Sequence, residues 1–212
     1  NNELSGPLAM ALIYEKLSKR KNKYSYRFLI APESIGAIMF LSKNLKTIKE
    51  NLEYGIVLTC LGGPVNKISY KDSPKTIRNS FSEFLKKDTN IDIREFDPNE
   101  GSNERHFTFP NVELPFGQFA RTVYGQYKEY HNSLDNIEFA GTNVHRGVRW
   151  NQLKYALRVS KIIDAIESDY LTPNGLSFSN DFFKGKKMFA SKTESAFVKI
   201  LLILYLLPAS IE

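Results

Sequence analysis

Residues 113–139, ELPFGQFARTVYGQYKEYHNSLDNIEF, combine a short apolar stretch with a polar, tyrosine-rich one. The apolar positions Phe116 and Phe119 predict a strand that ends in the core, and the tyrosines after it predict a loop in water. His131 follows this loop, and Asp135 stands four residues later. An imidazole held beside a carboxylate is a common arrangement for a metal ligand or a proton carrier. The alternative is a surface histidine beside an aspartate that caps the next short helix.

The chain on both sides of this stretch alternates strands with helices. Apolar runs and two-residue alternation predict strands at 24–31, 55–61, 68–70, 91–96 and 116–121. Apolar residues at helical spacing predict helices at 4–19, 35–44, 73–85, 148–168 and 196–207. Alternation of this kind predicts an α/β fold, a three-layer sandwich with a mostly parallel central sheet.

Several polar or glycine-rich loops follow predicted strands. They are Glu33, Gly62-Gly63, residues 101–106 and residues 124–131. Ligand sites in open α/β sheets gather beyond the carboxyl ends of the strands. We therefore expect these loops to share one rim of the sheet.

Composition narrows the class of protein. The 212 residues suit one domain of ordinary size, and the hydrophobic content of 42% is enough for a core. The net charge of +6 is spread along the chain, so nucleic-acid binding is not expected. The one cysteine, Cys60, lies in an apolar run, which predicts a small buried side chain, no internal disulfide and a reducing, cytoplasmic location.

The C-terminal part differs in pattern from the rest. No signal peptide is visible, and the apolar run 196–207 contains Lys199 and is shorter than the roughly 20 residues of a membrane span. We therefore expect a packed helix there and no membrane partner. A boundary near residue 172 divides an α/β domain, 1–172, from a linker and the start of a helical module, 173–212, whose apolar helix could join copies of the chain. Both ends of the sequence look cut, as in part of a longer protein.

Four motifs carry a family resemblance. In order they are NNELSGP at 1–7, APESIG at 31–36, GSNER at 101–105 and EYHNSLD at 129–135. Together they resemble, over about residues 1–170, the bacterial aminopeptidase-like proteins within the zinc aminopeptidase and glutaminyl cyclase superfamily. The resemblance implies a phosphorylase/hydrolase-like α/β sandwich of zinc-peptidase type that binds one or two zinc ions and cleaves a small peptide or amide.

The resemblance also implies roles for individual residues. Glu33 matches the general base that takes a proton from zinc-bound water. Asn2 and His131 match metal-ligand positions. Tyr130 could donate to a developing oxyanion.

Further positions match the surroundings of the family's site. Arg105 and Glu104 match substrate-binding positions, where Arg105 could pair with a substrate carboxylate or orient Glu104. Asp135 would hold His131 by a hydrogen bond to its second ring nitrogen. The alternatives are a structural ion pair for Arg105 and a carboxylate at a helix N-terminus for Glu33. Asn103 stands where many relatives carry aspartate.

This sequence departs from the family's pattern at three positions. Asn2 replaces an aspartate that binds zinc, Asn103 replaces another aspartate, and Ser34 replaces the second of two glutamates, so a ligand for a second metal is absent. Because an amide oxygen is a weaker zinc ligand than a carboxylate, the resemblance implies one weakly held zinc ion, with a further histidine upstream of Asn1. The alternative is a member of the fold that binds a ligand or partner without hydrolysis, with a role in surface-polysaccharide biosynthesis.

Overall fold

The structure is a computed structural model, and it describes residues 2, 4–22, 24–63, 68–74, 81–140, 163–164 and 199–206. The helices within these residues are α1 (Ser5–Ser18), α2 (Ile35–Asn51), α3 (Phe81–Leu85), α4 (Glu104–Thr108) and α5 (Ile137–Ala140). The strands are β1 (Ser25–Pro32), β2 (Tyr54–Leu58), β3 (Ile68–Lys71), β4 (Ile91–Arg94), β5 (Phe116–Ala120) and β6 (Lys199–Leu206).

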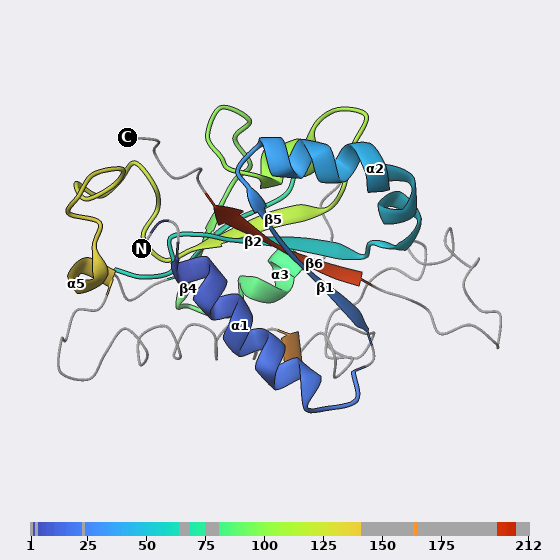
Figure 1. Cartoon of the computed structure of the whole chain (residues 1–212), viewed down its shortest axis with the longest axis horizontal. Helices are drawn as coiled ribbons and strands as arrows, with labels where there is room; N and C mark the ends of the chain where they lie inside the picture. The colour runs from blue at the N-terminus through green and yellow to red at the C-terminus, as the bar shows by residue number, and fades with distance from the viewer. Residues whose placement is uncertain are drawn as a thin grey trace.

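The described strands form one mixed sheet in the order β1-β6-β2-β5-β3-β4 (Figure 1). The pairs β1–β6, β6–β2, β2–β5 and β3–β4 are parallel, whereas β3 runs antiparallel to β5. This arrangement confirms the predicted α/β class with a mostly parallel sheet.

Helices cover both faces of the sheet, which makes three layers. On one face Ile13 and Leu17 of α1 pack with Ile56 and Leu58 of β2. On the other face Ala37 and Leu41 of α2 and Phe107 of α4 pack against the sheet. Their partners in the sheet include Val57 of β2 and Phe116 of β5. Figure 1 shows α2 on one side of the sheet and α1 on the other. Alternate residues of β2 therefore contribute to two cores, as expected for a parallel strand that is buried on both faces.

The junction between β1 and α2 is tight. β1 ends at Pro32 and α2 begins at Ile35. A Cβ atom on Gly36 would lie 2.6 Å from the Cβ of Ala31, so only glycine lets the helix start this close to the strand. The predicted strand and helix on either side of this junction are confirmed, although α2 continues to Asn51.

The helix predicted at 196–207 is wrong where the structure describes it. Lys199–Leu206 form β6, which pairs with β1 on one side and β2 on the other. A continuous apolar run suits a buried helix and a central parallel strand equally, so periodicity does not separate them. The predicted contact between copies of the chain was assigned to that helix and loses its basis over these residues. The boundary near residue 172 lies outside the described residues.

The predicted helix at 148–168 is described at two residues. Ile163 and Asp164 are helical, and Ile163 is fully buried against the α1 side of the sheet, as its spacing predicts. The carboxylate of Asp164 accepts hydrogen bonds from Lys16 and Arg20. The rest of that prediction falls on residues outside the described part.

Candidate functional site

The turn between β1 and α2, together with the residues of α4 that contact it, brings several polar groups together. We call Glu33, Ser34, Asn103 and His106 the β1 turn. The backbone N–H of Ser34 donates to Asn103 Oδ1 at 2.8 Å, and the Ser34 Oγ lies 3.0 Å from His106 Nε2. Glu33 is half-buried and immediately precedes Ser34.

Sheet direction alone does not bring α4 to this turn. Because β3 and β4 run opposite to β5, the carboxyl end of β4 points to the other edge of the sheet. The chain then returns across the face that α2 covers, and α4 packs against α2. The expectation that residues 101–106 reach the end of β1 is met at Asn103 and His106, but through helix packing.

The backbone of Ser34 is strained. Its φ is +55° and its ψ is −65°, a region that residues with a side chain rarely adopt. Conformations of this kind cost about 1–3 kcal/mol each and persist where surrounding contacts hold them. The contacts of Ser34 with Asn103 and His106 supply that restraint.

The environment of His106 keeps its imidazole neutral. Burial lowers the pKa of His106 below its ordinary value of 6.5, and the neighbouring Arg105 charge adds to the effect. At neutral pH a ring nitrogen of His106 is therefore available as an acceptor for the Ser34 hydroxyl.

A second group of polar side chains, the Cys60 cluster, contains Asn2, Cys60, Tyr127 and Asp135. The Cys60 thiol lies 3.0 Å from Asn2 Oδ1 and donates to it. Asp135 Oδ2 accepts from the Tyr127 hydroxyl at 3.1 Å and from the Asn2 backbone N–H at 3.2 Å. Two predicted site residues, Asn2 and Asp135, are thus in direct contact.

The Cys60 thiol should be unreactive in the folded protein. Burial raises the pKa of Cys60 from 9.0 to about 11, so about one thiol in a thousand is ionised at pH 8. We expect iodoacetamide to leave the folded chain unmodified at pH 8 over an hour and to alkylate Cys60 completely in 6 M guanidinium chloride. Mass spectrometry measures both. Rapid alkylation of the folded chain would contradict the buried position.

His131 contacts Tyr130, which in turn contacts Tyr127 of this cluster. His131 is exposed, has a φ of +55°, and its ring stacks on that of Tyr130 with centroids 3.8 Å apart. Tyr130 in turn meets Tyr127 edge to face at 5.5 Å. Asp135 contacts Asn2 and Tyr127, and the Asp135–His131 pair stays a prediction.

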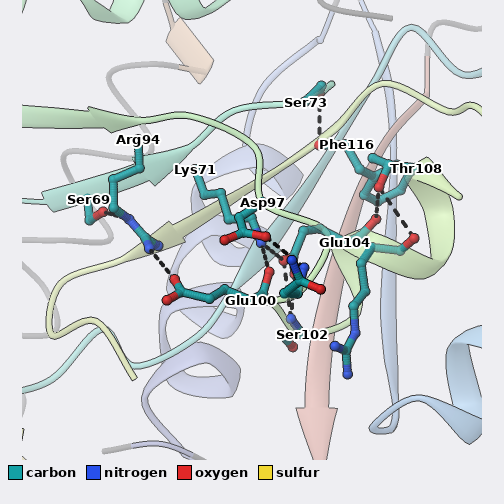
Figure 2. Close-up of polar contacts among 12 residues, drawn as sticks. Ser69, Lys71, Ser73, Arg94, Asp97, Glu100, Ser102, Glu104, Thr108 and Phe116 are labelled. Atoms are coloured by element: carbon teal, nitrogen blue, oxygen red, sulfur yellow. Dashed lines mark hydrogen bonds and ion pairs between the residues drawn. The ribbon is translucent and has the colours of Figure 1, made fainter. Parts of the chain in front are cut away.

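Glu104 occupies a different environment from the one expected of a substrate-binding residue. Its side chain is fully buried, and its carboxylate pairs with Lys71 at 2.9 Å (Figure 2). The backbone N–H of Ser102 also donates to both Glu104 oxygens. Glu104 therefore holds the loop that precedes α4. The neighbouring Arg105 is half-buried, and its role stays a prediction.

The predicted zinc ligands do not compose a metal site as they are placed here. Asn2 Oδ1 is engaged by Cys60, and His131 stacks on Tyr130 in solvent. Among the described residues there is no group of three or more His, Cys, Asp or Glu side chains that could hold a metal ion.

The structure adds residues to the candidate sites that sequence patterns indicate only weakly. Ser34 precedes Ile35-Gly36 and a helix, which matches the second half of the Gly-x-Ser-x-Gly turn found at the nucleophile of some α/β hydrolases. His106 follows Asn103 by three residues, so one helical turn places both on one face. Cys60 and Tyr127 lie 67 positions apart, and no local pattern connects them.

The fold and the β1 turn define a three-layer α/β domain with polar groups at the carboxyl end of its first strand. The chain belongs to the family described as "Domain of unknown function (DUF4910)", whose model matches residues 1–168. The names of the relatives described below confirm the resemblance to aminopeptidase-like proteins. Membership of the zinc superfamily stays a prediction.

A curated sequence and a solved structure from Clostridium acetobutylicum are similar to this chain. One, a "Putative polysaccharide biosynthesis protein with aminopeptidase-like domain", is 38% identical over 148 residues, which cover 65% of this chain and 32% of the relative. A crystal structure of a "putative peptidase" superposes with a TM-score of 0.69 at 33% identity and covers 79% of this chain and 38% of that one. The chain thus spans about a third of the length of the curated relative. Within the described residues, none of the helices is long and apolar enough to span a membrane.

Proposed function

We propose that this chain is the aminopeptidase-like hydrolase domain of a longer protein, and that it cleaves a peptide or amide bond at the β1 turn. The observation that carries the proposal is the restrained turn at the end of β1, where Asn103 and His106 hold Ser34 directly after Glu33. The names of the similar proteins from C. acetobutylicum support the reaction class.

Glu33 is the candidate general base of this reaction. Its carboxylate stands at the carboxyl end of a strand, the usual position of a ligand site in such sheets, and it is accessible to solvent because it is half-buried. In the proposal this carboxylate takes a proton from the attacking water within hydrogen-bond reach.

The substrate class follows from the relatives as a second part of the proposal. The name of one relative joins an aminopeptidase-like domain to polysaccharide biosynthesis. An amide carried by an amino sugar is therefore a candidate beside a short peptide. A cytoplasmic location belongs to the same proposal. Dependence on one zinc ion stays a prediction, because Asn2 and His131, its predicted ligands, are engaged by Cys60 and Tyr130.

Substitution Glu33→Gln should reduce hydrolysis by about 10²–10⁴-fold, because a glutamine keeps the shape of the side chain but accepts no proton. The assay uses the full-length protein with aminoacyl anilides, dipeptides and N-acetylated amino sugars, each with added zinc and with a chelator. Glu50→Gln, an exposed position in the last turn of α2, is the matched control and should match the unmodified protein.

Two results would contradict the proposal. One is an unchanged rate for Glu33→Gln. The other is the absence of hydrolysis of every substrate by the unmodified full-length protein, with or without zinc. The second result would favour the alternative, a domain that binds a ligand or partner without hydrolysis. The observation that favours this alternative is the buried amide of Asn103, whose Nδ2 has no hydrogen-bond partner within the described part of the chain.

A further inference from the structure

The hydroxyl of Ser34 does not do what a serine before a helix usually does. A serine at the N-cap normally accepts a hydrogen bond from a backbone N–H of the first helical turn. At the described start of α2, Ser34 makes no side-chain cap hydrogen bond, and its Oγ instead lies 3.0 Å from His106 Nε2. Ser34 thus has a positive φ and no cap hydrogen bond, and its hydroxyl contacts an imidazole instead.

The pair has the geometry of a nucleophile and its base. The distance of 3.0 Å allows Ser34 to donate its proton to His106 Nε2. Both residues are half-buried, so the pair is partly accessible from solvent. The lowered pKa of His106, caused chiefly by burial, leaves the ring neutral and able to accept that proton.

Asn103, which accepts from the backbone N–H of Ser34, also carries a hydrogen-bond donor. Because Asn103 Oδ1 accepts from the Ser34 N–H, the orientation of the amide is fixed, and Nδ2 is its other terminal atom. Asn103 is fully buried, and among the described residues Nδ2 has no partner. An unsatisfied buried donor on the residue that holds the backbone of Ser34 suits an oxygen that becomes negatively charged during reaction.

From this geometry we infer that Ser34 is a nucleophile, that His106 is its general base, and that Asn103 Nδ2 donates to the oxyanion of an acyl group. The inference concerns the same turn as the proposed hydrolase function and adds a covalent acyl-enzyme to it. The substrate class is an acyl ester or amide with a small acyl group.

The step balances without a cofactor. The Ser34 Oγ attacks the acyl carbon and its proton passes to His106 Nε2, while the carbonyl oxygen takes the negative charge opposite Asn103. The bond to the leaving alcohol or amine then breaks, and that group receives the proton from His106. Water next attacks the ester on Ser34, and its proton passes to Glu33, the base of the proposed function. The acid is released, and the Ser34 oxygen takes that proton from Glu33, which restores the hydroxyl.

A fluorophosphonate carrying a fluorophore tests the nucleophile directly, because it forms a stable P–O bond with an activated serine and releases fluoride. We expect one adduct per chain on the full-length protein, mapped to Ser34 by mass spectrometry. Ser34→Ala and Ser34→Gly should abolish it, and His106→Gln should slow it by more than about 100-fold. Ser34→Gly tolerates the positive φ, so loss of labelling there does not reflect misfolding.

Ser42→Ala is the control, since Ser42 is an exposed serine on the same helix whose hydroxyl bonds to a backbone carbonyl. It should label at the unmodified rate. No adduct on the unmodified protein, an adduct elsewhere, or an unchanged labelling rate in His106→Gln would overturn the inference.

The outcomes separate this inference from the proposed function. Hydrolysis that is lost in Glu33→Gln but kept in Ser34→Gly, without labelling, would overturn the nucleophile and leave water as the attacking group. Labelling of Ser34 that depends on His106, in a protein that hydrolyses no amide, would support the nucleophile and overturn the peptide or amide function.

Discussion

Removing the charge of Glu104 should destabilise this protein by about 3–5 kcal/mol, because it leaves the ammonium group of Lys71 buried without its partner. The side chains of Lys71 and Glu104 are 1% and 0% exposed, and their charged atoms are 2.9 Å apart. Lys71 also donates to the carbonyl oxygen of Glu100, and its Nζ lies 5.4 Å from the centre of the Phe96 ring. Figure 2 shows Lys71 with Glu100 and Glu104 at the loop that precedes α4.

The substitution Glu104→Leu and the double substitution Lys71→Met/Glu104→Leu distinguish the cost of an unpaired charge from the value of the pair. A buried ion pair is often replaced by apolar residues of similar size at little net cost. We therefore expect each single variant to lose about 3–5 kcal/mol and the double variant to lie much closer to the unmodified protein. Urea unfolding followed by circular dichroism measures the free energy of unfolding.

Glu83→Gln serves as the control for this prediction. Glu83 pairs with Lys86 on the surface, where both side chains are about half exposed, so its loss should change stability by less than about 0.5 kcal/mol. Additive costs in the Lys71/Glu104 double variant would show that the two charges do not depend on each other. A cost below about 1 kcal/mol for Glu104→Leu would show that Lys71 finds water or another partner.

The Lys71–Glu104 pair also links the stability of the protein to the position of Asn103 in the β1 turn. Glu104 is the first residue of α4, and the preceding Asn103 is the residue that accepts from Ser34. A loop that loses its anchor at Glu104 would shift Asn103. Variants at Glu104 are therefore expected to reduce the fluorophosphonate labelling of Ser34 in parallel with stability, unlike Glu83→Gln.

The elements whose boundaries carry local signals were predictable from sequence. The polar break at Glu33-Ser34 separates an apolar strand from an apolar-periodic helix, and the structure has β1 and α2 on either side. Gly36 marks the close approach, because a Cβ atom there would contact Ala31. The fold class followed from the alternation of such segments.

What depended on long-range contacts was not predictable. The apolar run at Lys199–Leu206 gives no local sign that it enters the sheet between β1 and β2. No local sequence pattern indicates that β3 runs antiparallel to β5, although this direction decides at which end of the sheet the carboxyl end of β4 lies. In the candidate site, Asn103 and Ser34 are 69 positions apart, so only packing of α4 on α2 reveals their contact.

The second prediction with a large effect concerns Gly55, where β2 passes over the ring of Phe116. The two residues are partners in the parallel β2–β5 pair. A Cβ atom on Gly55 would lie 2.2 Å from the Phe116 ring, a distance that real contacts do not reach. The ring has no room to withdraw, because Phe116 is fully buried and stacks on Phe107 with centroids 4.2 Å apart.

Gly55→Ala should therefore destabilise the protein by about 3 kcal/mol, at the upper end of the usual cost of adding one methyl group to a filled core. Phe116→Leu should relieve that clash, so the double variant Gly55→Ala/Phe116→Leu is expected to lose less than the sum of the two single variants. Gly125→Ala is the control: nothing lies within 4 Å of its Cβ position, and its φ of +73° leaves only a backbone cost of about 1 kcal/mol. Unfolding by urea compares the four proteins. Equal losses for Gly55→Ala and Gly125→Ala, or strict additivity in the double variant, would mean that the ring moves freely and that β2 and β5 are not locked together at this position.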